Sequence, residues 1–183
     1  MSGVTSEDHY RRKLIRQLRG AYSGELAAGH AYRGHARSLR DETQRARIRV
    51  IEAEEWHHRE LVGGLLRQLN ARPSMFREAL LWLIGNTISI LCRIGGWFVP
   101  MYGAGRLERT NIVEYEDAAF YAQMCGRKDM IECLLSMAEV EWEHERTFRD
   151  FLHGHWLLRF IPMWEEPPPK ASIREKIGRA LAS

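Results

Sequence analysis

Two Glu-x-x-His motifs lie in segments whose repeating residues are otherwise apolar. Glu55 and His58 form one motif, and Glu141 and His144 form the other. Residues three apart share one side of an α-helix, so the Glu and the His of each pair can bind the same ion. Burying a carboxylate in a core costs several kcal/mol unless a cation or a partner neutralises it. The two pairs therefore predict a buried metal site.

A third motif, Glu54 and His57, is offset from the first by one residue. Its helical stripe also carries Arg47, Gly64 and Gln68, a composition that is typical of a solvated face. We interpret Glu54 and His57 as residues that face water or support the ligands from outside.

Two further predicted stripes contain one acid each, Glu25 in the first and Glu114 in the second. The other members are Leu18, Ala28, Tyr32 and Leu39 in the first stripe, and Leu107, Ala118, Tyr121 and Met124 in the second. Glu116 lies off the second stripe. Asp117 flanks it, either as a polar residue at the edge of the bundle or as a hydrogen-bond partner of a ligand His. The predicted metal ligands are Glu25, Glu55, His58, Glu114, Glu141 and His144.

These four carboxylates and two imidazoles would form a hard, oxygen-rich donor set. Such a set suits iron or manganese better than a structural zinc site, which favours thiolates. Four carboxylate charges balance two divalent ions, and open positions could then bind dioxygen or peroxide. We predict two iron ions, with manganese as the alternative metal. The other interpretation is that the buried acids and histidines form ion pairs without a metal.

Helical periodicity covers most of the chain, and strand patterns are nearly absent. An all-α fold is therefore predicted, with helices near residues 10–39, 43–70, 105–126 and 129–153. Asp41 or Thr43 is expected to cap the second helix, and Gly126 to close the third. Asp129 and Glu132 resemble a capping box that opens the fourth. Two helix pairs, each with one Glu and one Glu-x-x-His, are typical of di-metal four-helix bundles.

Residues 79–92 are almost uncharged and separate the second and third predicted helices. A bilayer needs about 20 apolar residues, so this segment predicts either a crossover helix packed on the bundle or a helix in contact with a membrane. Residues 156–164 are again apolar and aromatic, and Ser172 and Glu175 predict a short C-terminal helix. The expected organisation is a bundle over residues 1–155, with an apolar helix inserted at about 75–99, and a tail over residues 156–183.

The net charge of +3 and the scattered arginines argue against nucleic-acid binding. Cys92, Cys125 and Cys133 share no C-x-x-C spacing, so we expect reduced thiols in a reducing compartment. The first residues predict neither a signal peptide nor a typical transit peptide. A cytoplasmic protein is therefore expected.

The residues around the predicted ligands match a known pattern. They are Gly24, Glu25, Ala28, Tyr32 and Gly34; Glu55, His58 and the run 72–74; Leu81 and Trp82; Val113, Glu114 and Tyr121; and Glu141 and His144. Over residues 18–151 this pattern resembles the demethoxyubiquinone hydroxylase family. The chain departs from the family at Tyr22 and Phe120, where the family usually has His, and at Tyr115, where it usually has an acid.

The resemblance implies a ferritin-like fold, a di-iron cofactor and hydroxylation of a polyprenylated quinone ring in ubiquinone biosynthesis. Dioxygen would be the co-substrate, and NADH or a redox partner the reductant. The resemblance also implies that the apolar segment 79–99 lies against a membrane and admits a lipid-soluble substrate. Peripheral association with the inner face of the cell membrane is therefore expected. Tyr121 and Tyr32 are the candidate catalytic residues, which would shape oxygen handling near the metals.

Other functions stay open at this point. The site could serve an oxidase, peroxidase or hydroxylase of a different small molecule, because Tyr22 and Phe120 depart from the family. The chain could instead be a non-catalytic lipid-binding protein at a membrane surface, with structural buried acids. A homo-oligomer or a partner in a biosynthetic complex is compatible with each of these functions.

Overall fold

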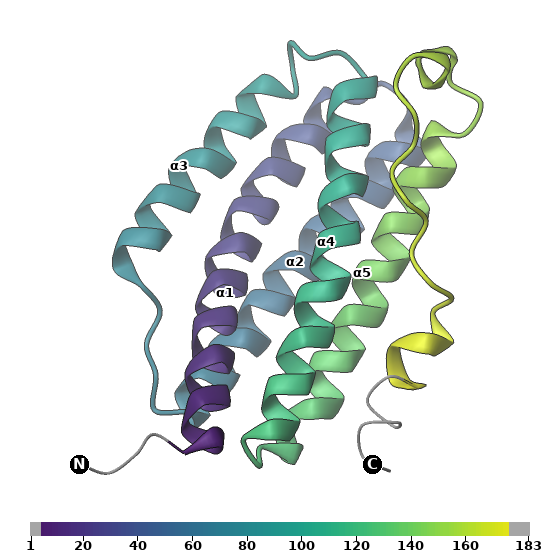
Figure 1. The fold of residues 1–183 in the computed structure, drawn as a ribbon. Coiled ribbons are helices and arrows are strands. Elements are labelled where there is room, and N and C mark those ends of the chain that lie inside the picture. The colour runs from purple at the N-terminus through teal and green to yellow at the C-terminus, as the bar shows by residue number, and fades with distance from the viewer. Residues whose placement is uncertain (1–4, 176–183) are drawn as a thin grey trace. The chain divides into compact units, whose positions relative to one another are not determined.

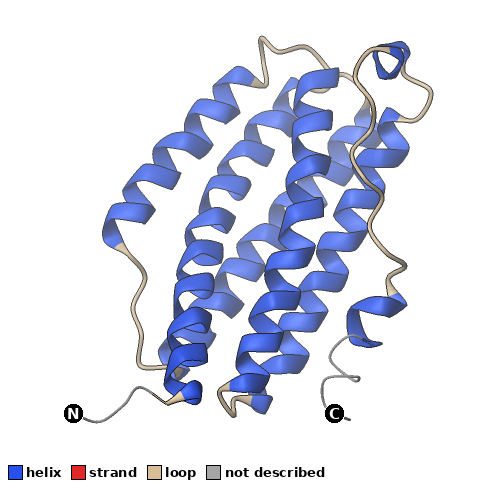
Figure 2. Cartoon of the chain, in the orientation of Figure 1, coloured by secondary structure: helices blue, strands red, loops and turns tan. Residues whose placement is uncertain are grey.

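The computed structural model describes residues 5–175, and they are almost entirely helical (Figures 1 and 2). The helices are α1 (Ser6–Ser38), α2 (Glu42–Gln68), α3 (Met75–Leu91), α4 (Phe98–Met124) and α5 (Ile131–Leu152), with short 3-10 helices η1 (Lys128–Met130) and η2 (Trp156–Arg159). No strand occurs within residues 5–175, which confirms the all-α prediction. The helix order and lengths are consistent with a ferritin-like bundle that carries an additional apolar helix, α3.

The chain divides into two compact units. The N-terminal unit is Arg12–Pro100, with most of α1, all of α2 and all of α3. The C-terminal unit combines Met1–Arg11 with Met101–Ser183 and contains α5 and most of α4.

In the N-terminal unit, a three-residue connection joins α1 to α2. Asp41 ends this connection as the N-cap of α2, and its side chain accepts a hydrogen bond from the backbone N–H of Gln44 at 2.9 Å. The cap satisfies a backbone donor that the first turn of the helix would leave without a partner. This part of the capping prediction is confirmed.

The apolar helix α3 lies beside α1 in this unit (Figure 1). The two backbones approach closely at Gly85, where a Cβ atom would lie 2.6 Å from the carbonyl oxygen of Ala27. Gly85 is the one buried residue of α3, whereas Phe76 is 78%, Leu83 57% and Ile90 66% exposed. The crossover helix therefore packs on α1 along a narrow strip and leaves its other apolar side chains accessible.

Two predicted helix starts need correction. The start near residue 105 is wrong, because α4 begins at Phe98. Pro100 lies in the first turn, where the missing N–H of proline removes no intrahelical hydrogen bond. The capping box is also wrong, because the carboxylate of Asp129 pairs with Arg127 at 2.6 Å and α5 begins at Ile131 with no side-chain cap.

Gly126 closes α4 as predicted. Its φ of 72° lies in the left-handed region that glycine adopts at little cost. The backbone N–H of Arg127 then donates to the carbonyl of Ala122 at 2.8 Å, which satisfies a carbonyl at the end of the helix.

The segment after α5 is tied to the C-terminal unit by polar contacts. The indole N–H of Trp164 donates to buried Glu145 at 2.6 Å, and Arg149 donates to the same carboxylate oxygen. Tyr102 of α4 donates its hydroxyl to the carbonyl of Pro162 at 2.9 Å. Residues 171–175 are helical, and the rest of the predicted C-terminal helix lies outside the described residues.

Candidate metal centre

In the N-terminal unit, α1 and α2 bring three predicted ligands together. Glu25 lies 13 residues before the end of α1, and Glu55 lies 13 residues after the start of α2. Because both helices rise about 1.5 Å per residue from a short connection, the two carboxylates reach the same level. Glu25, Glu55 and His58 each have a ligand atom within 4.8 Å of those of the others, and all three are buried.

In the C-terminal unit, α4 and α5 form a second cluster of two acids and one imidazole. The Nδ1 atom of His144 lies 3.4 Å from a carboxylate oxygen of Glu141 and 4.0 Å from one of Glu108. The other oxygen of Glu108 accepts a hydrogen bond from the side-chain amide of Asn111 at 2.9 Å. Glu108, Glu141 and His144 are all buried.

Glu108 is the residue that the sequence analysis missed. The predicted stripe on this helix included Leu107 and Met124, which are 59% and 40% exposed. The buried stripe contains Met101, Ala104 and Glu108 instead. Their spacing of three and four residues was visible in the sequence, but the predicted helix began at 105 and left the first two out.

Glu114 is half-buried and is not among the clustered ligand atoms. It lies 10 residues before the end of α4, and Glu141 lies 10 residues after the start of α5. Burial, followed by the charges of Asp117 and Glu141, raises the pKa of Glu114 above its ordinary value. The ligand role of Glu114 stays a prediction.

The third Glu-x-x-His motif, Glu54 and His57, lies at the surface, as predicted. His57 is exposed and faces Glu60 at 4.0 Å, and Glu54 lies 3.9 Å from Arg47. The helical position therefore separates His58 from His57 although both follow a Glu by three residues.

The two candidate catalytic tyrosines have different surroundings. Tyr32 is buried, and its ring stacks with that of His35 at 6.5 Å between centroids. Burial lowers the pKa of His35 to about 4, so its imidazole is neutral at neutral pH. Tyr121 is half-buried and contacts Tyr10 at 6.2 Å and Phe120 at 6.0 Å. The catalytic roles of Tyr32 and Tyr121 stay predictions.

Two of the three positions that depart from the family lie in aromatic contacts. The guanidinium of Arg59 stacks over the ring of Tyr22 at 3.8 Å and also pairs with Glu78 of α3. Phe120 packs edge-on against Tyr10 at 5.9 Å. Arginine prefers such flat ring faces, so Tyr22 helps to hold the guanidinium between α2 and α3.

The spacing of the C-terminal cluster suits a small divalent ion. Two ligand atoms that each lie about 2.1 Å from one ion are at most about 4.2 Å apart. The two distances from Nδ1 of His144, 3.4 and 4.0 Å, fall within this limit. Both clusters contain two carboxylates and one imidazole and no thiolate, the donor set expected for iron or manganese.

Residues 12–95 match the family model described as "Ubiquinone biosynthesis protein COQ7". This match confirms the resemblance to the demethoxyubiquinone hydroxylase family. It covers a little less than half of the 183 residues and contains Glu25, Glu55, His58 and all of α3. The COQ7 family consists of hydroxylases of ubiquinone biosynthesis, so the match supports an enzymatic role. Comparisons with curated proteins and with solved structures found no match.

Proposed function

We propose that the chain is a di-iron, dioxygen-dependent monooxygenase that hydroxylates a quinone-type ring of a lipid-soluble substrate in ubiquinone biosynthesis. One observation carries the proposal: each unit buries two carboxylates and one imidazole with ligand atoms close enough to share an ion. The COQ7 match over residues 12–95 supports the same class of reaction.

In this proposal the clusters Glu25, Glu55, His58 and Glu108, Glu141, His144 supply ligands to a two-metal site, with Glu114 as a further carboxylate. The support is the sequence pattern of one Glu and one Glu-x-x-His from each helix pair. When bound, two iron ions would supply the reductive activation of dioxygen, with electrons from NADH or a redox partner. The side chains of the six cluster residues would hold the metals, and their burial would exclude bulk water.

Tyr32 and Tyr121 are proposed to shape oxygen handling. Tyr32 follows Glu25 by seven residues, and Tyr121 follows Glu114 by seven. Seven residues are close to two helical turns, so each tyrosine shares a helix face with a predicted ligand.

The exposed apolar side of α3 supports peripheral membrane association. Phe76, Leu83 and Ile90 expose most of their side chains to solvent, and larger exposed apolar patches commonly mark interaction sites. Among the described residues, no helix combines the length and hydropathy that a membrane-spanning segment needs. We propose that α3 lies on the inner face of the cell membrane and gives a lipid-soluble quinone access to the protein.

A second candidate keeps the di-iron site but changes the substrate to another small molecule. Two observations favour it. The guanidinium of Arg59 stacks on the ring of Tyr22, and Phe120 packs on Tyr10. The family usually has His at positions 22 and 120.

The test combines metal analysis with product analysis. The purified chain is loaded anaerobically with iron(II), then given a reductant, isotopically labelled dioxygen and a demethoxyubiquinone analogue with a short tail. We expect about two iron ions per chain and one labelled oxygen atom in the hydroxylated ring.

Variants Glu55→Gln and Glu141→Gln should lose metal while keeping their helix content, whereas exposed Glu60→Gln should behave as the unmodified chain. Unchanged metal content in the first two variants would overturn the site. Normal iron content with dioxygen consumption but no quinone product would favour the second candidate.

A further inference from the structure

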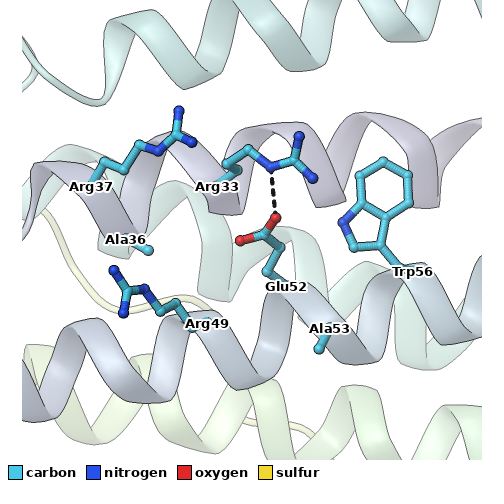
Figure 3. Close-up of a pocket in the computed structure, with 7 residues that line it drawn as sticks. All are labelled: Arg33, Ala36, Arg37, Arg49, Glu52, Ala53 and Trp56. Carbon is cyan, nitrogen blue, oxygen red and sulfur yellow. Dashed lines mark hydrogen bonds and ion pairs between the residues drawn. The ribbon is translucent and has the colours of Figure 1, made fainter.

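A pocket with a volume of about 420 Å³ lies between α1 and α2 on the N-terminal unit. Ala36 of α1 and Ala53 of α2 lie on its lining, where larger side chains would fill the space between the helices (Figure 3). None of its lining residues belongs to the metal clusters.

Three of the seven residues that line this pocket are arginines. Arg33 and Arg37 line it from α1, and Arg49 lines it from α2 (Figure 3). The carboxylate of Glu52 accepts a hydrogen bond from Nε of Arg33 at 2.9 Å, so it neutralises one of the three cations. Arg37 and Arg49 have no acidic partner within residues 5–175, and two positive charges are left in excess.

The aromatic wall of the pocket is already occupied. The ring of Trp56 contacts His30 edge-on at 5.4 Å, and the guanidinium of Arg33 lies 5.7 Å from its centroid. Burial, followed by the charge of Arg33, lowers the pKa of His30, so this imidazole adds no charge at neutral pH. The groups still able to engage a ligand are therefore the guanidinium groups rather than a ring face.

We propose that this pocket binds a phosphate-type oxyanion through Arg37 and Arg49, with Arg33 as the third cation. Guanidinium groups present paired N–H donors that match phosphate oxygens, and charge-assisted hydrogen bonds of this kind are stronger than neutral ones. A dianionic phosphate would balance the two charges that Glu52 leaves unneutralised.

Two sources could supply this phosphate group. One is the headgroup of an anionic phospholipid, since His30 also contacts Trp82 of α3 at 6.3 Å and Trp82 is 52% exposed. The other is a soluble organic or inorganic phosphate. The arginine chemistry is the same for both, and the experiment separates them.

The first arm measures binding of inorganic phosphate and pyrophosphate to the full chain by calorimetry. Arg37→Gln/Arg49→Gln should bind about tenfold more weakly or worse, the loss expected for charge-assisted hydrogen bonds. The matched control is Arg16→Gln/Arg67→Gln, which removes the same charge from exposed positions on the same two helices.

The second arm measures sedimentation with vesicles of phosphatidylcholine alone or mixed with phosphatidylglycerol. Glu52→Gln should strengthen binding in whichever of the two assays detects binding by the unmodified chain, because Arg33 is then released from its ion pair. Exposed Glu60→Gln, which changes the net charge equally, should have a smaller effect.

If Arg37→Gln/Arg49→Gln loses affinity for soluble phosphate and the control variant does not, the result supports the pocket and a soluble ligand. If this variant loses binding only to the anionic vesicles, and the control variant does not, the result supports the pocket and a lipid headgroup. The proposal is overturned if neither probe binds, or if the pocket variant and its control weaken binding equally. Metal-free protein should bind as well as loaded protein, since the pocket residues are not metal ligands.

Discussion

Replacing Glu108 by Gln tests the metal centre at the residue that the helical pattern did not predict. The variant keeps the size of the side chain and an oxygen that can accept from Asn111, so the fold should be preserved. It removes one negative charge and one potential ligand atom. Metal affinity therefore reports on the carboxylate itself.

The expected magnitude follows from the distance to His144. A Glu108 oxygen lies 4.0 Å from Nδ1 of His144, so one small ion could contact both atoms. At an effective dielectric constant of about 20, a carboxylate and a divalent ion about 4 Å apart attract by about 8 kcal/mol, and desolvation of the two groups offsets about half of this energy. Each 1.4 kcal/mol is a factor of about ten, so affinity should fall by up to about a thousandfold. Loss of a group that only supports a ligand weakens metal binding by about 10- to 100-fold.

The assay is anaerobic titration with manganese(II), followed by electron paramagnetic resonance, on Glu108→Gln, Glu114→Gln and the control Glu116→Gln. A loss beyond about a hundredfold identifies a direct ligand, and a smaller loss identifies a supporting residue. If Glu108→Gln and Glu116→Gln bind the ion equally tightly, the argument from burial and distance is refuted.

Three further outcomes are expected. Gly85→Ala places a Cβ atom 2.6 Å from the carbonyl oxygen of Ala27 and should destabilise the chain by about 1–3 kcal/mol in urea unfolding, whereas Gly24→Ala, with open space, should be stabilising by up to about 1 kcal/mol. Buried His35 has its pKa lowered to about 4, so the folded state binds fewer protons than the unfolded state. Stability should therefore fall as the pH drops from about 6.5 towards 4, and His35→Gln should flatten this dependence in metal-free protein while exposed His57→Gln should not. Saturation with metal should raise the melting temperature, because a ligand at 100 times its Kd stabilises by about 2.7 kcal/mol per site, and no rise on metal addition would contradict the site.

The N-terminal cluster was predictable from the sequence because its determinants are local. Asp41 marks the start of α2, and Glu25 and Glu55 lie equally far from the connection between the helices. Two antiparallel helices joined by a short connection must place such residues at one level. The choice of His58 over His57 followed from the apolar residues on the same stripe.

The face of α4 could not be chosen in the same way. Glu108 and Glu114 both lie on stripes that contain apolar residues, and only packing shows that Glu108 is buried while Leu107 is exposed. The predicted start near residue 105 left Pro100 outside the helix, although proline fits the first turn of a helix. The start of α5 was misjudged because Asp129 pairs with Arg127, a competing contact that the capping pattern does not contain.

The sequence by itself therefore determined an all-α chain, the helices that carry the ligands and the side of α2 that faces the core. These features depend on helical periodicity and on connection length, which are local properties. Only the tertiary structure decided which face of α4 is buried, the contact of Trp164 with Glu145, and the pocket that is lined by Arg33, Arg37 and Arg49. Each of these depends on which residues from distant parts of the chain are packed together, and no local pattern encodes that choice.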